Sequence, residues 1–240
     1  MPSRAELEAT LSRCSSLLVL RASASNSSKD LVELDAWYRG ELRELVKKRR
    51  EKNEDGKAEL TVKEVGKLME WKLARGKWRP RLHSLALSNP DSLVRSTTSS
   101  ASLAAPSSAL TELSKLKGLG PATASAILAL WYPETEPFMS DEAMENCEAY
   151  GEGEEGQGKR EYTAKAWKVF GEKMRERKEK EEWDTVEELE KALWSWAVER
   201  KYGGEEKGSE DEEEKPKKRG KKRKSDVAEE SSTTKKAKSK

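Results

Sequence analysis

The 240-residue sequence contains few of the side chains from which most hydrolases and metalloenzymes are built. Histidine occurs once, at His83, so a site with several histidine ligands is excluded and a serine triad would have to use that residue. The two cysteines, Cys14 and Cys147, are too few for a disulfide scaffold, a four-cysteine iron–sulfur cluster or a structural zinc finger. No run of about 18 apolar residues is present. We therefore expect no metal site, no iron–sulfur cluster and no membrane partner.

Hydrophobic residues are scarce and charged residues are abundant. Hydrophobic residues make up 34% of the chain, and 38% of the residues are charged, against about 25% in an ordinary globular domain. The net charge is nevertheless only +2, because 47 basic residues oppose 45 acidic ones. A chain of this composition cannot bury all of its length in one core, so part of it is predicted to be disordered.

The composition divides the chain into three segments. Residues 1–28 are rich in serine and alanine and are predicted to be mostly flexible, with at most a short helix. Residues 29–202 contain all eight tryptophans, and their apolar side chains recur at helical spacing. Residues 203–240 lack aromatic side chains and join an acidic run to a basic one, a pattern typical of a disordered tail. The sequence therefore predicts one all-α domain between two flexible tails.

The C-terminal tail carries a cluster of basic residues typical of a nuclear localisation signal. We therefore expect the protein in the nucleus, with the nuclear import machinery as a partner. The alternative is a solvated charge run or a nonspecific DNA-binding arm. The residues of the expected signal are Lys217, Lys218, Arg219, Lys221, Lys222, Arg223 and Lys224.

Two capping boxes and two breaks organise the central segment. Residues 61–64 and 185–188 each place a threonine three residues before a glutamate, which predicts that a helix begins at each point. The Ser/Thr/Ala-rich residues 96–108 and the Gly/Glu-rich residues 151–158 are predicted to interrupt the helices. No alternation typical of a β-strand is present.

The most specific pattern lies in residues 109–132, where two predicted helices flank Gly118-Leu119-Gly120. Glycine permits a sharp turn with positive φ. Pro121 is suited to the first turn of the second helix. The start of that helix leaves backbone N–H groups without helical partners at its positive end, an arrangement that favours a phosphate.

Residues 116–128 resemble the helix-hairpin-helix motif: a hydrophobic residue, any residue, glycine, a hydrophobic residue and glycine, then a helix of small residues. The resemblance implies contact with the DNA backbone without reading of base sequence. It also allows a monovalent cation on the hairpin carbonyls. The alternative is a helical hairpin that only reverses the chain. The hairpin residues expected to contact DNA are Lys117, Gly118, Leu119, Gly120, Ala122 and Thr123.

The segment after the hairpin extends this resemblance to the helix-hairpin-helix DNA glycosylase superfamily. Asp141 follows a loop and a short hydrophobic run, at almost the distance at which the catalytic aspartate of that superfamily follows its hairpin. The resemblance covers about residues 109–145 by motif, and it implies that Asp141 assists cleavage of a glycosidic bond. The alternative is a helix-capping carboxylate next to Ser140.

The chain also departs from the superfamily pattern. Glu142-Ala143-Met144 stands where members commonly have Thr-His-Val. Bifunctional members carry a lysine just after the second hairpin glycine, where this chain has Pro121-Ala122. The resemblance therefore implies a monofunctional enzyme that releases a base and leaves an abasic site.

Residues 71–82 form a second candidate site, with five basic side chains and no acidic one. A compact positive patch in a nearly neutral domain indicates a polyanionic partner. Trp71 and Trp78, seven residues apart, are predicted to lie in the core rather than to stack on bases. The basic residues expected to contact phosphates are Lys72, Arg75, Lys77, Arg79 and Arg81.

These patterns predict a nuclear DNA-binding protein that contacts the DNA backbone, acts in DNA repair and removes a damaged base flipped into a helical cleft. The alternative is a non-catalytic DNA-binding or chromatin-associated protein with the same fold. That alternative needs only the hairpin and the basic patch, whereas catalysis also needs Asp141.

Overall fold

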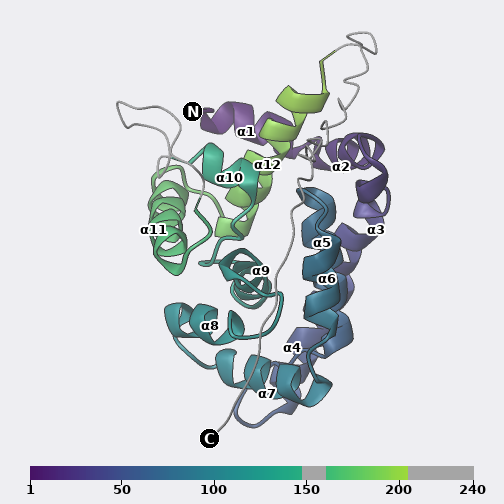
Figure 1. The fold of residues 1–240 in the computed structure, drawn as a ribbon. Coiled ribbons are helices and arrows are strands. Elements are labelled where there is room, and N and C mark those ends of the chain that lie inside the picture. Colours follow the sequence, from purple (N-terminus) through teal and green to yellow (C-terminus); the bar gives the residue numbers. More distant parts are fainter. Residues whose placement is uncertain (148–160, 205–240) are drawn as a thin grey trace, which may run out of the picture. The chain divides into compact units, whose positions relative to one another are not determined.

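The computed structural model describes residues 1–147 and 161–204 (Figure 1), and within these ranges it contains helices and no strand, as predicted. None of these helices is both long and apolar enough to cross a membrane. The Gly/Glu-rich residues 151–158 and the expected localisation signal lie outside the described residues. The α-helices are α1 (Arg4–Leu11), α2 (Cys14–Ser23), α3 (Leu31–Ala36), α4 (Arg43–Lys52), α5 (Val62–Arg75), α6 (Pro80–Leu87), α7 (Asp91–Ala101), α8 (Pro106–Leu113), α9 (Pro121–Trp131), α10 (Asp141–Glu145), α11 (Ala164–Lys180) and α12 (Val186–Tyr202). A short 3-10 helix, η1 (Asn26–Ser28), precedes α3, and a π-helix, η2 (Trp37–Leu42), joins α3 to α4.

Helices α5 and α12 begin where the sequence predicts. Thr61 accepts a hydrogen bond from the backbone of Glu64 at 3.2 Å, and the Glu64 carboxylate accepts one from the Thr61 backbone at 2.8 Å. Thr185 likewise accepts from the backbone of Glu188 at 3.0 Å. The Glu188 carboxylate, however, accepts from the backbone of Asp184 instead. The first capping box is therefore complete and the second is half formed.

The N-terminal segment differs from the flexible segment that its composition predicts. Residues 4–23 form α1 and α2, and both helices pack against α12. Leu7 and Leu17 are buried in the core. A capping box between Ser3 and Glu6 fixes the start of α1. The abundant serines and alanines predicted flexibility, but a few apolar side chains are enough for these helices to pack against α12.

The break predicted over residues 96–108 is also shorter than expected, because α7 continues to Ala101. Thr98 accepts a hydrogen bond from the backbone of Leu60 at 2.8 Å. Ser102, which follows the helix, accepts one from the backbone of Ala58 at 3.0 Å. Thr98 and Ser102 thus accept hydrogen bonds from buried backbone N–H groups of the segment before α5. Their polar side chains are needed for this pairing and do not indicate a loop.

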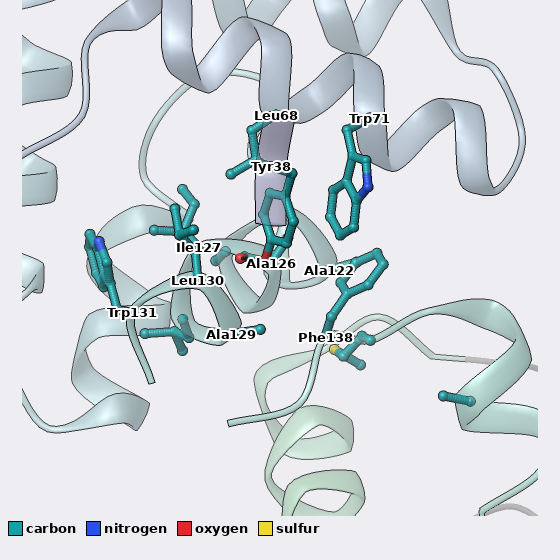
Figure 2. Packing of buried hydrophobic residues seen from close by; sticks show 14 of the residues in the cluster. Tyr38, Leu68, Trp71, Ala122, Ala126, Ile127, Ala129, Leu130, Trp131 and Phe138 are labelled. Atoms are coloured by element: carbon teal, nitrogen blue, oxygen red, sulfur yellow. Dashed lines mark hydrogen bonds between the residues drawn. The ribbon is translucent and has the colours of Figure 1, made fainter. Parts of the chain in front are cut away.

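Helix α9 lies at the centre of the core and packs against α4, α5, α8 and α11 (Figure 1). All of its residues from Ala122 to Trp131 are buried. Figure 2 shows the ring of Tyr38 beside that of Trp71 above this helix, with ring centroids 3.8 Å apart. The Tyr38 hydroxyl donates to the carbonyl oxygen of Ala126 at 2.7 Å. The small side chains of α9 thus let the neighbouring helices approach its backbone. These helices hold the N-terminus of α9 in place.

Candidate nucleic-acid site

The end of α5, the turn before α9 and the start of α10 surround one cavity of about 230 Å³. It is smaller than the roughly 300–1,000 Å³ pockets that hold drug-sized ligands, so its size suits a single base or sugar. Apolar side chains form much of its wall, and three features that the sequence suggested separately meet there: the glycine turn, the basic stretch and the aspartate. Its lining includes Lys72, Arg79, Leu82, Gly118, Gly120, Phe138, Met139 and Asp141.

The two glycines of the turn have different roles. Gly118 has a φ of +77°, and a Cβ atom there would lie 2.7 Å from the backbone oxygen of Leu82 and the backbone nitrogen of Ala86. Only glycine fits both this conformation and this close approach to α6. At Gly120 a Cβ atom would meet nothing within 4 Å. The protein's own packing therefore requires Gly118, whereas Gly120 leaves its backbone open to a ligand.

Two of the expected hairpin contacts face the protein. The backbone N–H of Leu119 donates to Leu116 at 3.1 Å, and that of Thr123 donates to Gly120 at 2.9 Å. The Thr123 hydroxyl faces the sulfur of Met69, 3.8 Å away. Leu119 and Thr123 thus support the turn, and this corrects their expected role as direct contacts to DNA.

The remaining amides of the turn make no hydrogen bond within the protein, although Ala122 itself is buried. Within the described ranges, the backbone N–H groups of Gly118, Gly120 and Ala122 have no hydrogen-bond acceptor. Ala122 lies in the first turn of α9, where amides have no partner in the helix and the helix dipole is positive. Lys117 precedes the turn and is exposed. This end of the hairpin offers N–H donors and positive charge to an anion.

Asn89 fixes the turn from outside, a role that the sequence did not reveal. Its side-chain amide donates to the carbonyl of Lys117 at 2.9 Å, and its side-chain oxygen accepts from the Lys117 N–H at 2.9 Å. The residue is 5% exposed. Asn89-Pro90 indicates a helix start, which explains the proline before α7 but not the buried amide. Sequence spacing could not reveal this role, because the partner of Asn89 lies 28 residues away along the chain.

Arg75 is a core residue, which corrects its expected contact with phosphate. It is 2% exposed. Its guanidinium donates to the Glu190 carboxylate at 2.8 and 3.4 Å, and it lies 4.7 Å from the ring centre of Trp194. A buried arginine held by a carboxylate is not available to DNA. Lys77, Arg79 and Arg81 of the same stretch are exposed.

The two tryptophans of the basic stretch separate in the structure. Trp71 is buried, as predicted, and stacks on Tyr38. Trp78 is 38% exposed, so its predicted place in the core is wrong. A spacing of seven residues places two side chains on the same face only within one continuous helix. Here α5 ends at Arg75, and Trp78 lies in the loop before α6.

Asp141 lines the cavity and does not cap α10. The cap is Ser140, whose hydroxyl accepts from the backbone of Ala143 at 3.3 Å and donates to Glu190 at 2.5 Å. Asp141 is the first residue of the helix and is half-buried, and the Tyr162 hydroxyl donates to its carboxylate. Ser140 therefore caps the helix in place of Asp141, and Asp141 lines the same cavity as Gly118 and Gly120.

Glu142 provides a second carboxylate in the cavity wall. Burial raises its pKa above the ordinary value, and the nearby charges of Asp141 and Glu190 raise it further, while Arg75 opposes them. The site thus contains two adjacent carboxyl groups in different surroundings. In the described residues no group of three or more His, Cys, Asp or Glu side chains is placed to hold a metal ion.

Comparison of the chain with protein-family models, with curated proteins and with solved structures gave no match. The residues of the cavity and the turn beside it are therefore the basis for a functional proposal.

Proposed function

We propose that this protein is a nuclear DNA-binding protein of the helix-hairpin-helix glycosylase type, which holds the DNA backbone and accepts one flipped nucleotide in the cavity. The observation that carries the proposal is the meeting of the glycine turn, basic side chains and Asp141 around one space. Each feature alone has an ordinary structural explanation. Together they provide the parts that base removal from DNA requires.

Backbone binding rests on the turn before α9. The unpaired amides of Gly118, Gly120 and Ala122 suit phosphate oxygens, and the exposed backbone at Gly120 permits a close approach. Lys117, beside the turn, adds positive charge. Such contacts position a protein on DNA without reading its sequence. We therefore expect weak sequence dependence and strong salt dependence.

Base flipping rests on the cavity itself. Enzymes that act on a base in duplex DNA rotate the nucleotide out of the stack into a fitted pocket. Here the apolar side chains of Leu82, Phe138 and Met139 provide walls against which an unstacked base or sugar packs. The exposed Lys77 and Arg79 lie at this cavity too, where they attract the flanking phosphates.

Asp141 is the proposed catalytic residue. Cleavage of a glycosidic bond develops positive charge on the sugar, and a carboxylate beside it stabilises that charge or activates a water molecule. Tyr162 fixes the orientation of the carboxylate through its hydrogen bond. The base leaves with the bonding electron pair and takes up a proton, and a water molecule supplies the hydroxyl group at C1′. The product is a free base and an abasic site.

Base release from defined duplexes tests this function. We expect the full chain to release a base from at least one of a panel of duplexes with alkylated, oxidised or deaminated bases. Asp141→Asn should lower the rate about 10²-fold or more, whereas Asp184→Asn, an exposed aspartate outside the cavity, should not change it. Glu142→Gln reports whether the adjacent carboxyl shares the role.

Two results would remove the catalytic part of the proposal. One is binding of every duplex without release of any base, and the other is full activity of Asp141→Asn. Either result leaves the alternative function, a non-catalytic DNA-binding or chromatin-associated protein.

Nuclear placement rests on the basic cluster of residues 217–224. Residues 203–240 fused to a cytoplasmic reporter should carry the reporter into the nucleus. A fusion in which Lys221, Lys222, Arg223 and Lys224 are replaced by alanine should stay in the cytoplasm. Cytoplasmic retention of the unaltered fusion would contradict the placement.

A further inference from the structure

A second cavity, of about 490 Å³, adjoins the first one, and the proposed function does not use it. Its volume falls in the range of roughly 300–1,000 Å³ in which proteins hold small ligands, so it has room for a base together with its sugar. The residues that line both cavities are Arg75, Gly76, Lys77, Asp141 and Glu142. The other walls of the second cavity come from α2, from the end of α10 and from the last turns of α12.

Two aromatic side chains of α12 line the second cavity. Trp196 and Tyr202 are partly exposed, whereas Trp194 of the same helix is buried in the core. The guanidinium of Arg200 lies 4.7 Å from the ring centre of Trp196, and the ammonium of Lys201 lies 5.3 Å from that of Tyr202. Accessible aromatic rings beside basic side chains are typical of sites for unstacked nucleotides, because the ring stacks on the base and the cation attracts the phosphate.

Arg21 of α2 brings a buried positive charge to the same cavity. Its side chain lines the cavity, and the residue is only 6% exposed. Within the described residues, its guanidinium donates to neutral acceptors: the carbonyl oxygens of Arg75 at 3.1 Å and Gly76 at 2.6 Å, and the hydroxyl of Ser28 at 2.8 Å. A buried charge that is not bonded to an opposite charge is costly, so an anion in the cavity would be stabilised by it.

The hydrogen bonds of Arg21 also fix the boundary between the two cavities. Arg75 is the last residue of α5 and Gly76 follows it, and both line the two cavities. Helix α2, which carries Arg21, packs against α3 and α12. The N-terminal segment thus completes the second cavity and holds its wall in place before a ligand binds.

The remaining charges of the second cavity favour an anionic ligand. Of the exposed charged groups that line it, Lys77, Arg200 and Lys201 are basic and Glu145 is acidic. Glu142 is half-buried, and burial raises the pKa of its carboxyl group, which favours the uncharged form. The accessible surface of this cavity therefore carries more positive than negative charge, as the binding of a phosphate requires.

We propose that the second cavity binds the nucleotide next to the flipped one on the same strand, with its base against Trp196 and Tyr202 and its phosphate facing the cations of α2 and α12. Two successive nucleotides fill both cavities without a break, because the cavities adjoin along shared residues. The protein should then prefer DNA with two adjacent unpaired nucleotides, in which the cost of unpairing is already met. The inference rests on the proposed function, because it needs the first nucleotide in the first cavity.

The affinity for two matched duplexes tests the inference. One duplex contains a single mismatch and the other contains two adjacent mismatches, and anisotropy measures the binding of the full chain to each. We expect the wild type to bind the tandem mismatch about tenfold more tightly, since one more base stacks on the protein. A variant with Trp196→Ala and Tyr202→Ala should lose this preference and keep the wild-type affinity for the single mismatch. Trp37→Ala should retain the preference, because Trp37 is a partly buried tryptophan beside Lys67 and lies outside both cavities.

Photo-cross-linking of the wild-type protein gives a second readout that needs no variant. A 5-iodouracil base forms a covalent bond on irradiation with an aromatic ring that stacks on it. It is placed in turn at each position of the tandem mismatch, and peptide mapping locates the cross-link. From one of the two positions, the cross-link should lie on Trp196 or Tyr202. Circular dichroism of the variants checks that the helices remain.

The outcomes separate the two proposals. Equal wild-type affinity for the two duplexes, an unchanged preference in the double variant, or cross-links only to other residues would each overturn the role of the second cavity. The second cavity would then serve a ligand other than DNA, and the proposed function of the first cavity would stand. Absence of binding to either duplex overturns both proposals.

Discussion

Asn89 pairs with both backbone groups of Lys117, donating to its carbonyl oxygen and accepting from its N–H, each at 2.9 Å. Twenty-eight residues separate the two positions along the chain. One buried side chain thus holds the backbone next to the glycine turn in a fixed conformation. The amides proposed to bind phosphate are therefore positioned before DNA arrives.

Replacement of Asn89 by alanine should loosen this turn. The change removes both hydrogen bonds of the partly buried Lys117 backbone, and each lost bond should lower the free energy of unfolding by about 1 kcal/mol. DNA affinity should fall as well, because the turn must be ordered on binding. Denaturant unfolding and fluorescence anisotropy with a labelled duplex measure the two effects. The matched control is Asn53→Ala, since Asn53 makes one exposed hydrogen bond to its own loop. Unchanged stability and affinity of Asn89→Ala would contradict this role.

The two hairpin glycines should respond differently to alanine. Gly118→Ala introduces a Cβ atom at a φ of +77° and 2.7 Å from backbone atoms of α6, so the variant should be clearly less stable. Gly120→Ala meets nothing in the protein, so its stability should match the wild type while its affinity for DNA falls. Thermal unfolding and anisotropy test both variants. Wild-type affinity of Gly120→Ala would show that DNA does not approach this backbone.

The salt dependence of binding should identify the phosphate contacts. Each phosphate contact that is lost lowers the slope of log affinity against log salt by about 1. We expect that change for single alanine substitutions at Lys77, Arg79 and Arg81, and we expect no change for Lys48→Ala, an exposed lysine of α4 outside the cavity. The full chain is used throughout, so any contribution of the basic tail is the same in every titration. A slope that none of the three substitutions lowers would remove this surface from the DNA contact.

The pH dependence of stability should report the burial of Lys72. Its folded pKa of about 8 lies below the unfolded value of about 10.4. Between these values the unfolded chain binds more protons than the folded one, so the contribution of Lys72 to stability rises with pH. Other lysines and tyrosines also titrate in this range, so the informative quantity is the difference from Lys72→Met. The wild type should gain stability relative to Lys72→Met from pH 8 to pH 10. A constant difference would show that Lys72 is not desolvated.

Local signals in the sequence predicted much of the fold. Thr61 and Glu64 marked the start of α5 because a capping box acts over three residues. The glycine turn and the start of α9 were predicted in the same way, since glycine and proline determine backbone conformation locally. Asp141 was singled out by its distance from the hairpin, and the structure places it in the cavity beside that hairpin.

Features that depend on distant partners were not predictable from spacing. Arg75 is buried because Glu190, 115 residues later, neutralises it, and no local pattern distinguishes it from the exposed Arg79. Likewise, α1 packs against the distant α12, and its Leu7 is buried in the core. Lys72 was predicted to contact phosphate, but its partial burial in the cavity wall was not predictable, since it depends on how α5, α9 and α10 come together.

The central claim, that a nucleotide leaves the DNA stack and enters the cavity, is tested most directly by 2-aminopurine fluorescence. This base analogue is quenched when it is stacked in a duplex and becomes bright when it is flipped out. A duplex with 2-aminopurine at a mismatched position is titrated with the full chain, and anisotropy of the same duplex reports binding. The account predicts that emission rises severalfold and reaches a plateau together with binding. Full binding with unchanged emission would contradict it.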